Sequence, residues 1–179
     1  MGQIIDFSQL NLLSSTLHKN KKRIVLATGV YDLLHPGHQL FLQKAKRLGD
    51  ILFVGLESDA RVKQLKGPGR PVEDLQTRLQ KVTKHTVADY VFSLPTTFDK
   101  PRVREALITT IKPNFLAVSD HTPFQKQKQV ILKKYGGTMQ IVAKQIPGFS
   151  TTAQISSKQR IPLLDKGEEI SKIALGSKD

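Results

Sequence analysis

The sequence predicts an α/β fold in which helices cover a doubly wound, mostly parallel sheet of five strands. Short apolar runs alternate with helical patterns along the 179 residues, and the run from Ile51 to Leu56 is apolar throughout. A strand of that kind is typical of a parallel sheet with helices on both faces. Such sheets use right-handed crossovers, and their ligands bind beyond the carboxyl ends of the strands.

Apolar periodicity places the individual elements. The expected strands, in chain order, are Ile24 to Ala27, Ile51 to Leu56, Tyr90 to Phe92, Asn114 to Val118 and Met139 to Ala143. The expected helices carry apolar stripes and span residues 1–22, His38 to Leu48, Asp74 to Lys84, Pro101 to Thr110 and Pro123 to Tyr135. Ser58 or Asp59 can cap a further short helix.

Cap and turn residues set the ends of these elements. Ser8 is expected to cap the leading helix, and Pro101 suits the first turn of its helix. Gly49 is expected to end the second helix, and the pair at 136–137 to stop the last one. The glycine- and proline-rich loop over residues 66–71 is expected to be mobile.

Composition narrows the class of protein. Hydrophobic residues make up 39% of the chain and charged residues 24%, as in an ordinary globular domain. The absence of cysteine excludes disulfides and thiolate metal ligands, and five histidines argue against a structural zinc site. No signal peptide or transmembrane run is visible, so a cytoplasmic location is expected. Residues 1–160 are expected to form one domain, followed by a charged tail or short helix over 161–179.

The net charge of +13 favours a polyanionic ligand, such as nucleotide phosphates, nucleic acid or an anionic membrane surface. A basic surface without a specific partner is the alternative. Aromatic residues make up only 6% of the chain, and no RNA-reading signature with interleaved aromatics is present. Neither nucleic acid nor a membrane is therefore the expected partner.

The segment from His35 to His38 (H-P-G-H) follows the first expected strand. A tight turn there, with a helix opening at the second histidine, would aim two imidazoles at a helix N-terminus. Backbone N–H groups and the helix dipole favour a phosphate at that place. The alternative is a Pro-Gly turn with two solvent-facing histidines.

Two longer segments resemble a known family. Residues 28–38 (T-G-V-Y-D-L-L-H-P-G-H) resemble the signature of the cytidylyltransferase-like nucleotidyltransferase superfamily. Residues 62–72 (V-K-Q-L-K-G-P-G-R-P-V), followed by Arg78, resemble the D-glycero-β-D-manno-heptose 1-phosphate adenylyltransferase domain, which makes ADP-heptose. The resemblance runs from about residue 20 to about residue 157, and it implies the Rossmann-like nucleotidyltransferase fold.

The resemblance implies four catalytic residues. His35 and His38 would donate hydrogen bonds to α- and β-phosphate oxygens, and Lys63 and Lys66 would close over the triphosphate or the acceptor phosphate. Taken alone, two lysines three residues apart on a helix are more often a solvated face.

The resemblance also implies contacts to the nucleotide. The expected binding residues are Thr28, Gly29, Val30, Tyr31, Asp32, Gly37, Asp120, Ser150 and Thr151. Asp32 could orient a histidine or contact the nucleotide or its metal, with a turn-forming role as the alternative. Hydroxyls at Ser150 and Thr151 suit the β- and γ-phosphates, although they could equally be a plain helix cap.

Arg70 and Arg78 are expected to bind the acceptor or its phosphate, with a surface ion pair between Arg78 and Asp74 as the alternative. Two segments depart from the related families. Residues 145–149 lack the arginine seen in glycerol-phosphate cytidylyltransferases, which weakens a cytidylyl prediction. Residues 117–120 (A-V-S-D) stand where the heptose family shows a K-G-G-D-like segment, and only Asp120 matches it.

The resemblance thus implies an enzyme that moves AMP from ATP to a phosphorylated small molecule, such as a sugar 1-phosphate, and releases pyrophosphate. Mg²⁺ would be bound through the nucleotide phosphates, with no metal site made of protein side chains. A homodimer is the expectation for the family. Glycerol-3-phosphate cytidylyltransferase and FAD synthetase are the alternatives within the enzyme class. A nucleic-acid-binding or regulatory protein on a degenerate transferase fold is the alternative outside it.

Overall fold

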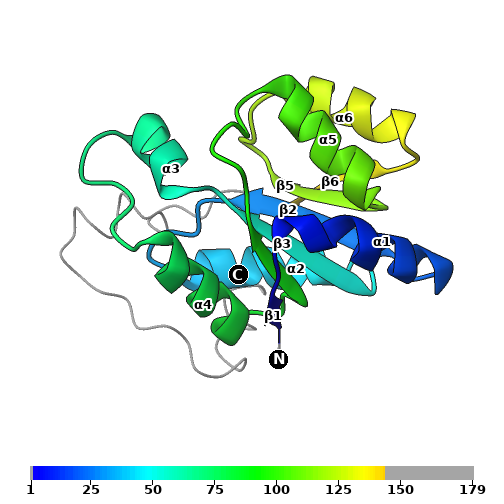
Figure 1. Cartoon of the computed structure of the whole chain (residues 1–179), viewed down its shortest axis with the longest axis horizontal. Helices are drawn as coiled ribbons and strands as arrows, with labels where there is room; N and C mark the ends of the chain where they lie inside the picture. Colours follow the sequence, from blue (N-terminus) through cyan, green and yellow to red (C-terminus); the bar gives the residue numbers. More distant parts are fainter. Residues whose placement is uncertain (1, 144–179) are drawn as a thin grey trace, which may run out of the picture.

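Six strands form the sheet of the computed structural model, which describes residues 2–143 (Figure 1). The strands are β1 (Gln3–Ile4), β2 (Ile24–Gly29), β3 (Ile51–Leu56), β4 (Tyr90–Ser93), β5 (Phe115–Ser119) and β6 (Thr138–Ala143). Their order across the sheet is β1-β4-β3-β2-β5-β6, and every neighbouring pair is parallel. The doubly wound parallel sheet is confirmed, with one strand more than the five predicted.

The additional strand takes the place of the start of the predicted leading helix. Gln3 and Ile4 pair with β4 at the edge of the sheet, so their backbone groups are satisfied by the sheet and not by a helix. A 3₁₀ turn over Phe7–Gln9 follows, and α1 spans only Leu10–Lys19. The prediction of a helix over residues 1–22 is therefore wrong for residues 2–6, which form the strand and the turn, and for residues 20–22 after the end of α1.

The predicted cap of that helix is also displaced. Ser8 lies inside the 3₁₀ turn and cannot be its cap. The chain turns at Asp6, whose backbone N–H donates to Oε1 of Gln9 at 2.8 Å.

The remaining helices lie close to their predicted positions. They are α2 (Pro36–Lys46), α3 (Asp59–Lys66), α4 (Leu75–His85), α5 (Pro101–Ile111) and α6 (Gln125–Lys134). The one difference that matters for function is that α2 begins at Pro36 and not at His38. Proline suits the first helical position because its φ is already helical, and His35 is the extended N-cap residue before it (φ −133°, ψ 168°).

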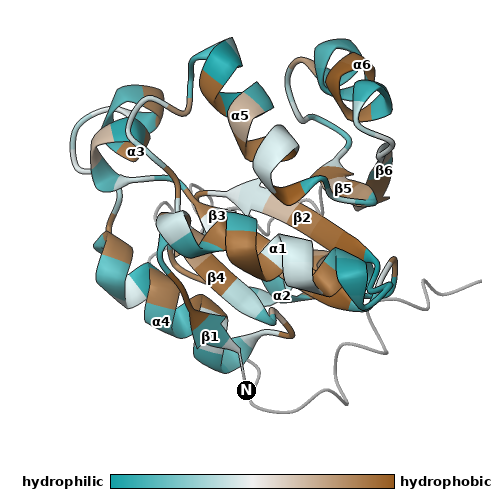
Figure 2. Cartoon of the chain, turned by 45° about the vertical axis from the view of Figure 1, so that its right-hand side comes forward, coloured by the Kyte–Doolittle hydropathy of each residue, from teal (hydrophilic) through white to brown (hydrophobic). Residues whose placement is uncertain are grey.

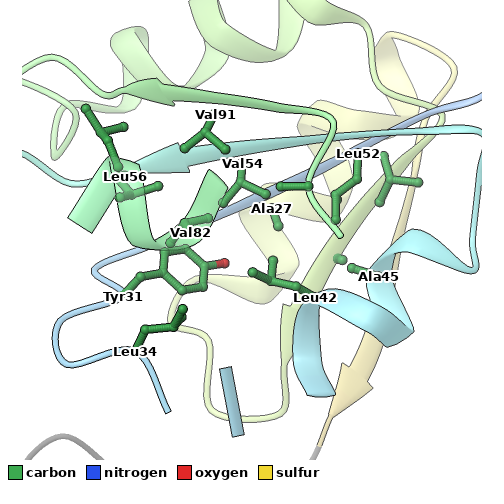
Figure 3. Close-up of a cluster of buried hydrophobic side chains, with 14 residues drawn as sticks. Ala27, Tyr31, Leu34, Leu42, Ala45, Leu52, Val54, Leu56, Val82 and Val91 are labelled. Carbon is green, nitrogen blue, oxygen red and sulfur yellow. The ribbon is translucent and has the colours of Figure 1, made fainter. Parts of the chain in front are cut away.

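The two faces of the sheet carry separate apolar cores. Val25 and Ala27 of β2 face the layer formed by α2 and α4, whereas Ile24 and Leu26 face α1, α5 and α6. The helices turn their apolar stripes toward the sheet (Figure 2). Figure 3 shows the first core, in which Tyr31 packs among side chains from the strands, α2 and α4. Both faces of β2 are thus covered, which explains its unbroken apolar run.

The strand order reverses next to β2. The chain continues from β2 to β3 and β4 on one side, then crosses back to β5 and β6 on the other. The switch point therefore lies beyond the carboxyl ends of β2 and β5, where open α/β sheets bind their ligands. The His35–His38 segment follows β2 directly, so the fold places it at this point.

Candidate active site

His35 and His38 lie together at the N-terminus of α2. Their rings stack with centroids 3.7 Å apart and planes 21° apart. The edge of Tyr31 packs against His38, with ring centroids 5.3 Å apart. His35 is only 4% exposed, so the alternative of two solvent-facing histidines is wrong.

Both imidazoles are neutral at physiological pH. Burial lowers the pKa of His35 to about 4, and burial together with the nearby His35 lowers the pKa of His38 to about 3. The Nδ1 atom of each ring is buried and has no hydrogen-bond partner among the described residues. The pair therefore brings N–H donors, and no fixed positive charge, to a helix end that favours an anion.

Asp32 holds the following loop against this site. Its carboxylate is 1% exposed and accepts from Nε of Arg70 at 3.0 Å and from Nη2 of Arg70 at 2.8 Å. It also accepts from the backbone N–H groups of Val72 and Glu73, each at 3.0 Å. Asp32 is thus a positioning residue for the loop over residues 70–73, and this ion pair engages the guanidinium of Arg70.

Arg78 differs most from its predicted role. Its side chain is fully buried, and it donates to the carbonyl oxygens of Glu73, Val30 and Glu57 at 3.0, 2.6 and 2.9 Å. It also forms an ion pair with Asp59 at 2.5 Å. These contacts join three loops at the carboxyl edge of the sheet. The prediction that Arg78 binds the acceptor does not fit this geometry, because its donors are engaged by the protein.

The alternative ion pair between Arg78 and Asp74 is not formed in the structure. Asp74 is the N-cap of α4 and accepts from the backbone N–H of Thr77 at 2.7 Å. Its carboxylate therefore caps the helix, and Asp59 is the acidic partner of Arg78.

Lys63 and Lys66 are exposed on α3, which projects beyond the sheet in Figure 1. Ser58 caps this helix as predicted, because its Oγ accepts from the backbone N–H of Arg61 at 3.3 Å. Neither lysine forms an ion pair with any residue in the range 2–143. The structure thus leaves both ammonium groups available at the start of the glycine-rich loop.

Three of the predicted nucleotide-binding residues lie at the end of β2 or just after it. Thr28 lines a cavity of about 70 Å³ at the switch point, together with Phe41 and residues 116–119 of β5. Gly29 packs against the Tyr31 ring so closely that a Cβ at this position would lie 2.9 Å from it. Tyr31 itself is buried, which raises the pKa of its hydroxyl far above its usual range.

Val30 and Gly37 contribute backbone to the site. The Val30 carbonyl accepts from Arg78, and Gly37 lies in the first turn of α2, between the two histidines. Asp120 lies on the exposed turn after β5 and pairs with His121. Ser150 and Thr151 lie outside the described residues.

Sequence reasoning missed Lys128. It lies on α6, and it lines the same cavity as Thr28. Nothing in its local sequence sets it apart from the other basic residues of α6, so only the packing of α6 beside β5 reveals it.

Comparison with known proteins identifies the family. Residues 26–166 match the family model described as cytidylyltransferase-like. The chain belongs to this family. The bifunctional protein HldE of a Nitratiruptor species is 39% identical over 150 residues, which are 84% of this chain and 30% of that protein. HldE of Pseudomonas syringae pv. syringae is 34% identical over 151 residues, 84% of this chain and 31% of that protein.

The chain spans less than a third of the length of these curated relatives. Among solved structures, a lipopolysaccharide core biosynthesis protein from Thermoplasma volcanium GSS1 is 26% identical, with a TM-score of 0.55 over 70% of this chain and 99% of that one. A pantoate-beta-alanine ligase from Francisella tularensis has a TM-score of 0.58 over 97% of this chain and 85% of that one. At 16% identity, the ligase shows the fold alone.

Within residues 2–143, no three or more His, Asp or Glu side chains are grouped so that they could hold a metal ion. No helix in that range has the length and apolar character that a membrane crossing requires.

Proposed function

We propose that this protein moves AMP from ATP to a phosphorylated sugar, with D-glycero-β-D-manno-heptose 1-phosphate as the leading candidate, and releases pyrophosphate. The observation that carries the proposal is the stacked, neutral pair of His35 and His38 at the N-terminus of α2, at the switch point of a cytidylyltransferase-like fold. The identity to proteins named HldE supports the sugar branch of the family.

The chemistry needs positioning and charge stabilisation. An oxygen of the acceptor phosphate attacks the α-phosphorus of ATP and forms a new P–O bond. The bond from the α-phosphorus to the oxygen bridging to the β-phosphate breaks, and pyrophosphate leaves with that electron pair. The imidazole N–H groups of His35 and His38, with the backbone N–H of Gly37 in the first turn of α2, donate to phosphate oxygens as negative charge shifts toward the leaving group.

The other predicted residues support this arrangement. Lys63 and Lys66 bring positive charge to the triphosphate from the exposed side, while Asp32 and Arg70 fix the loop that follows them. Thr28, Gly29, Val30 and Tyr31 shape the nucleotide side of the site.

Asp120, Ser150 and Thr151 are the remaining residues that we propose contact the nucleotide. Mg²⁺ is expected to enter with the triphosphate, which brings the oxygen ligands that this ion prefers, and to neutralise part of its charge. We further propose a cytoplasmic homodimer in which residues 1–160 form the transferase domain.

The test is pyrophosphate release in the presence of Mg²⁺. ATP and CTP are each combined with D-glycero-β-D-manno-heptose 1-phosphate, glycerol 3-phosphate and FMN. Release with ATP and the heptose phosphate alone supports the proposal. A preference for CTP and glycerol 3-phosphate, or for ATP and FMN, would replace it with a cytidylyltransferase or an FAD synthetase. No release, together with RNA binding that weakens steeply with salt, would support a binding protein instead.

A further inference from the structure

A second group of charged side chains lies at the carboxyl edge of the sheet, and two of its members belong to α5 and α6, which cover the face opposite α2 and α4. Its members come from the end of β3, from α3, from the loop before α5, and from α5 and α6: Glu57, Arg61, Asp99, Arg104 and Lys128. The charges of Arg61, Asp99, Arg104 and the neighbouring Arg78 act on the Glu57 carboxyl, and those of Arg104 and Glu57 act on Lys128. We call these five residues the edge cluster.

The charges of the edge cluster are not paired with one another. No side chain in it forms an ion pair with another residue in the range 2–143. Oε2 of Glu57 and Nε of Arg61 are buried and lack a hydrogen-bond partner among the described residues. Arg104 donates to the backbone carbonyl of Asp99 at 2.5 Å, and its guanidinium lies 5.7 Å from the centroid of the Phe124 ring. The side chains of the cluster are half-buried or exposed, but buried polar atoms without partners, such as those of Glu57 and Arg61, are costly, and a ligand would supply what they lack.

Lys128 connects this group to the switch point. It lines the cavity that Thr28 of β2 and Ser119 of β5 also line. Burial and the positive charge of Arg104 lower its pKa to about 8, and the carboxylate of Glu57 only partly opposes this effect. An anion next to Lys128 and Arg104 would relieve their repulsion and hold both in the charged form.

The position of the edge cluster fits an in-line displacement. His35 and His38 lie at the N-terminus of α2, which covers the same face of the sheet as α4. Arg104 and Lys128 belong to α5 and α6, which cover the other face. In-line transfer puts the attacking oxygen and the leaving pyrophosphate on opposite sides of the α-phosphorus. With the triphosphate held by the histidines, the edge cluster is where the attacking molecule would lie.

We propose that Glu57, Arg104 and Lys128 bind the acceptor, with the two cations holding its phosphate and the Glu57 carboxylate accepting a hydrogen bond from a hydroxyl group. The acceptor is thereby a phosphorylated sugar or polyol, in which anionic and hydroxyl groups lie close together. This inference rests on the proposed function and assigns the acceptor to residues that the sequence motifs do not contain.

Steady-state kinetics separate the acceptor from ATP. Lys128→Met should raise the KM for D-glycero-β-D-manno-heptose 1-phosphate about tenfold or more, since a charge-assisted hydrogen bond is lost, and should leave the KM for ATP within about twofold. Lys126→Met is the matched control, because Lys126 is exposed on the same helix. A rise in the KM for ATP alone would assign the cluster to the triphosphate and overturn the proposal.

Calorimetric titration of the whole protein gives a readout that does not depend on turnover. Heptose 1-phosphate and inorganic phosphate serve as the two probes. Lys128→Met should weaken both, whereas Glu57→Gln should weaken only the sugar phosphate and leave inorganic phosphate unchanged or bound more tightly. A substitution that weakens the binding of the sugar phosphate and not that of inorganic phosphate cannot act through a merely structural role.

The two proposals can fail separately. If the wild-type protein releases no pyrophosphate but shows this titration pattern, the proposed reaction fails and the subsite stands. If it turns over the acceptor, but Lys128→Met and Lys126→Met have the same KM and the same affinities, the subsite is overturned. Failure of the wild-type protein to bind either probe overturns it as well.

Discussion

Two groups of charge flank the carboxyl end of β2, and they differ in how completely the protein satisfies them. On the side of α4, Arg78 is fully buried and donates to three carbonyl oxygens and Asp59, while Asp32 accepts from Arg70 and two backbone N–H groups. On the side of α5 and α6, Glu57 and Arg61 retain buried polar atoms without a partner among the described residues.

This difference separates a structural role from a binding role. Charges whose hydrogen bonds are all made within the protein hold the backbone in place, and removing one leaves the others unsatisfied. Charges that the fold brings together without partners add little stability of their own, but they are ready for a ligand. Substitutions on the two sides should therefore affect different measurements.

The largest effect is expected at Arg78. Arg78→Met would remove the buried donor to Oδ1 of Asp59 and to three carbonyl oxygens, so the free energy of unfolding should fall by about 3–5 kcal/mol. Urea unfolding measures this loss of stability, with Arg102→Met at an exposed position of α5 as the control. A loss below about 1 kcal/mol would contradict a structural role for Arg78.

The next effect is on catalysis at His38. His38→Ala removes an aligned donor from the phosphate site, so kcat should fall roughly 10²- to 10³-fold while the fold is retained. Pyrophosphate release measures the rate, circular dichroism checks the fold, and His85→Ala on α4 serves as the control. Full activity in the His38 variant would exclude the proposed mechanism.

The histidine pair should also make stability depend on pH. Both pKa values are lower in the folded protein, about 4 for His35 and about 3 for His38, than the ordinary value of 6.5. As the pH falls below about 6.5, the unfolded chain takes up protons that the folded pair refuses. Stability is then lost, by up to about 1.4 kcal/mol per pH unit for each histidine.

Urea unfolding between pH 7 and 5 measures this slope. The His35→Gln, His38→Gln double variant is the control, because it retains the carboxylates but lacks both titrating rings. Equal slopes in the two proteins would mean that the two histidines keep their ordinary pKa in the folded protein.

The smallest effect on stability is expected at Lys128, on the side of α5 and α6. Lys128→Met removes a half-buried cation that has no ion-pair partner within residues 2–143, so the free energy of unfolding should stay within about 1 kcal/mol or rise. The same urea titration compares it with Lys126→Met. A loss of stability as large as that of Arg78→Met would show that the ammonium group of Lys128 is stabilised by partners within the protein.

Local patterns were sufficient where a local cause determines the structure. The apolar runs of β2 and β3 predict strands because both of their faces are buried, and the H-P-G-H segment predicts a helix start beyond β2, although the helix begins at Pro36 and not at His38 as predicted. The two-residue strand β1 escaped prediction because Gln3 and Ile4 form a strand only through their partner β4.

The roles of Arg70 and Arg78 could not be predicted from the sequence for a similar reason. Arg78 lies beside Asp74 in sequence, but its acceptors come from loops 5 to 48 residues away along the chain. The pairing of Arg70 with Asp32 spans 38 residues. No local pattern tells such an arginine from one that binds a phosphate.

The sequence alone determined the α/β class, the parallel sheet, the histidine motif after the first long strand and the family resemblance, because each depends on neighbouring residues or on a short motif. The tertiary structure alone decided which charges are satisfied and which are not. That distinction depends on distances between segments that meet only when the sheet is assembled, since Glu57, Arg104 and Lys128 come from the end of β3, α5 and α6. It is also the distinction that separates the residues expected to hold the fold from those expected to hold the acceptor.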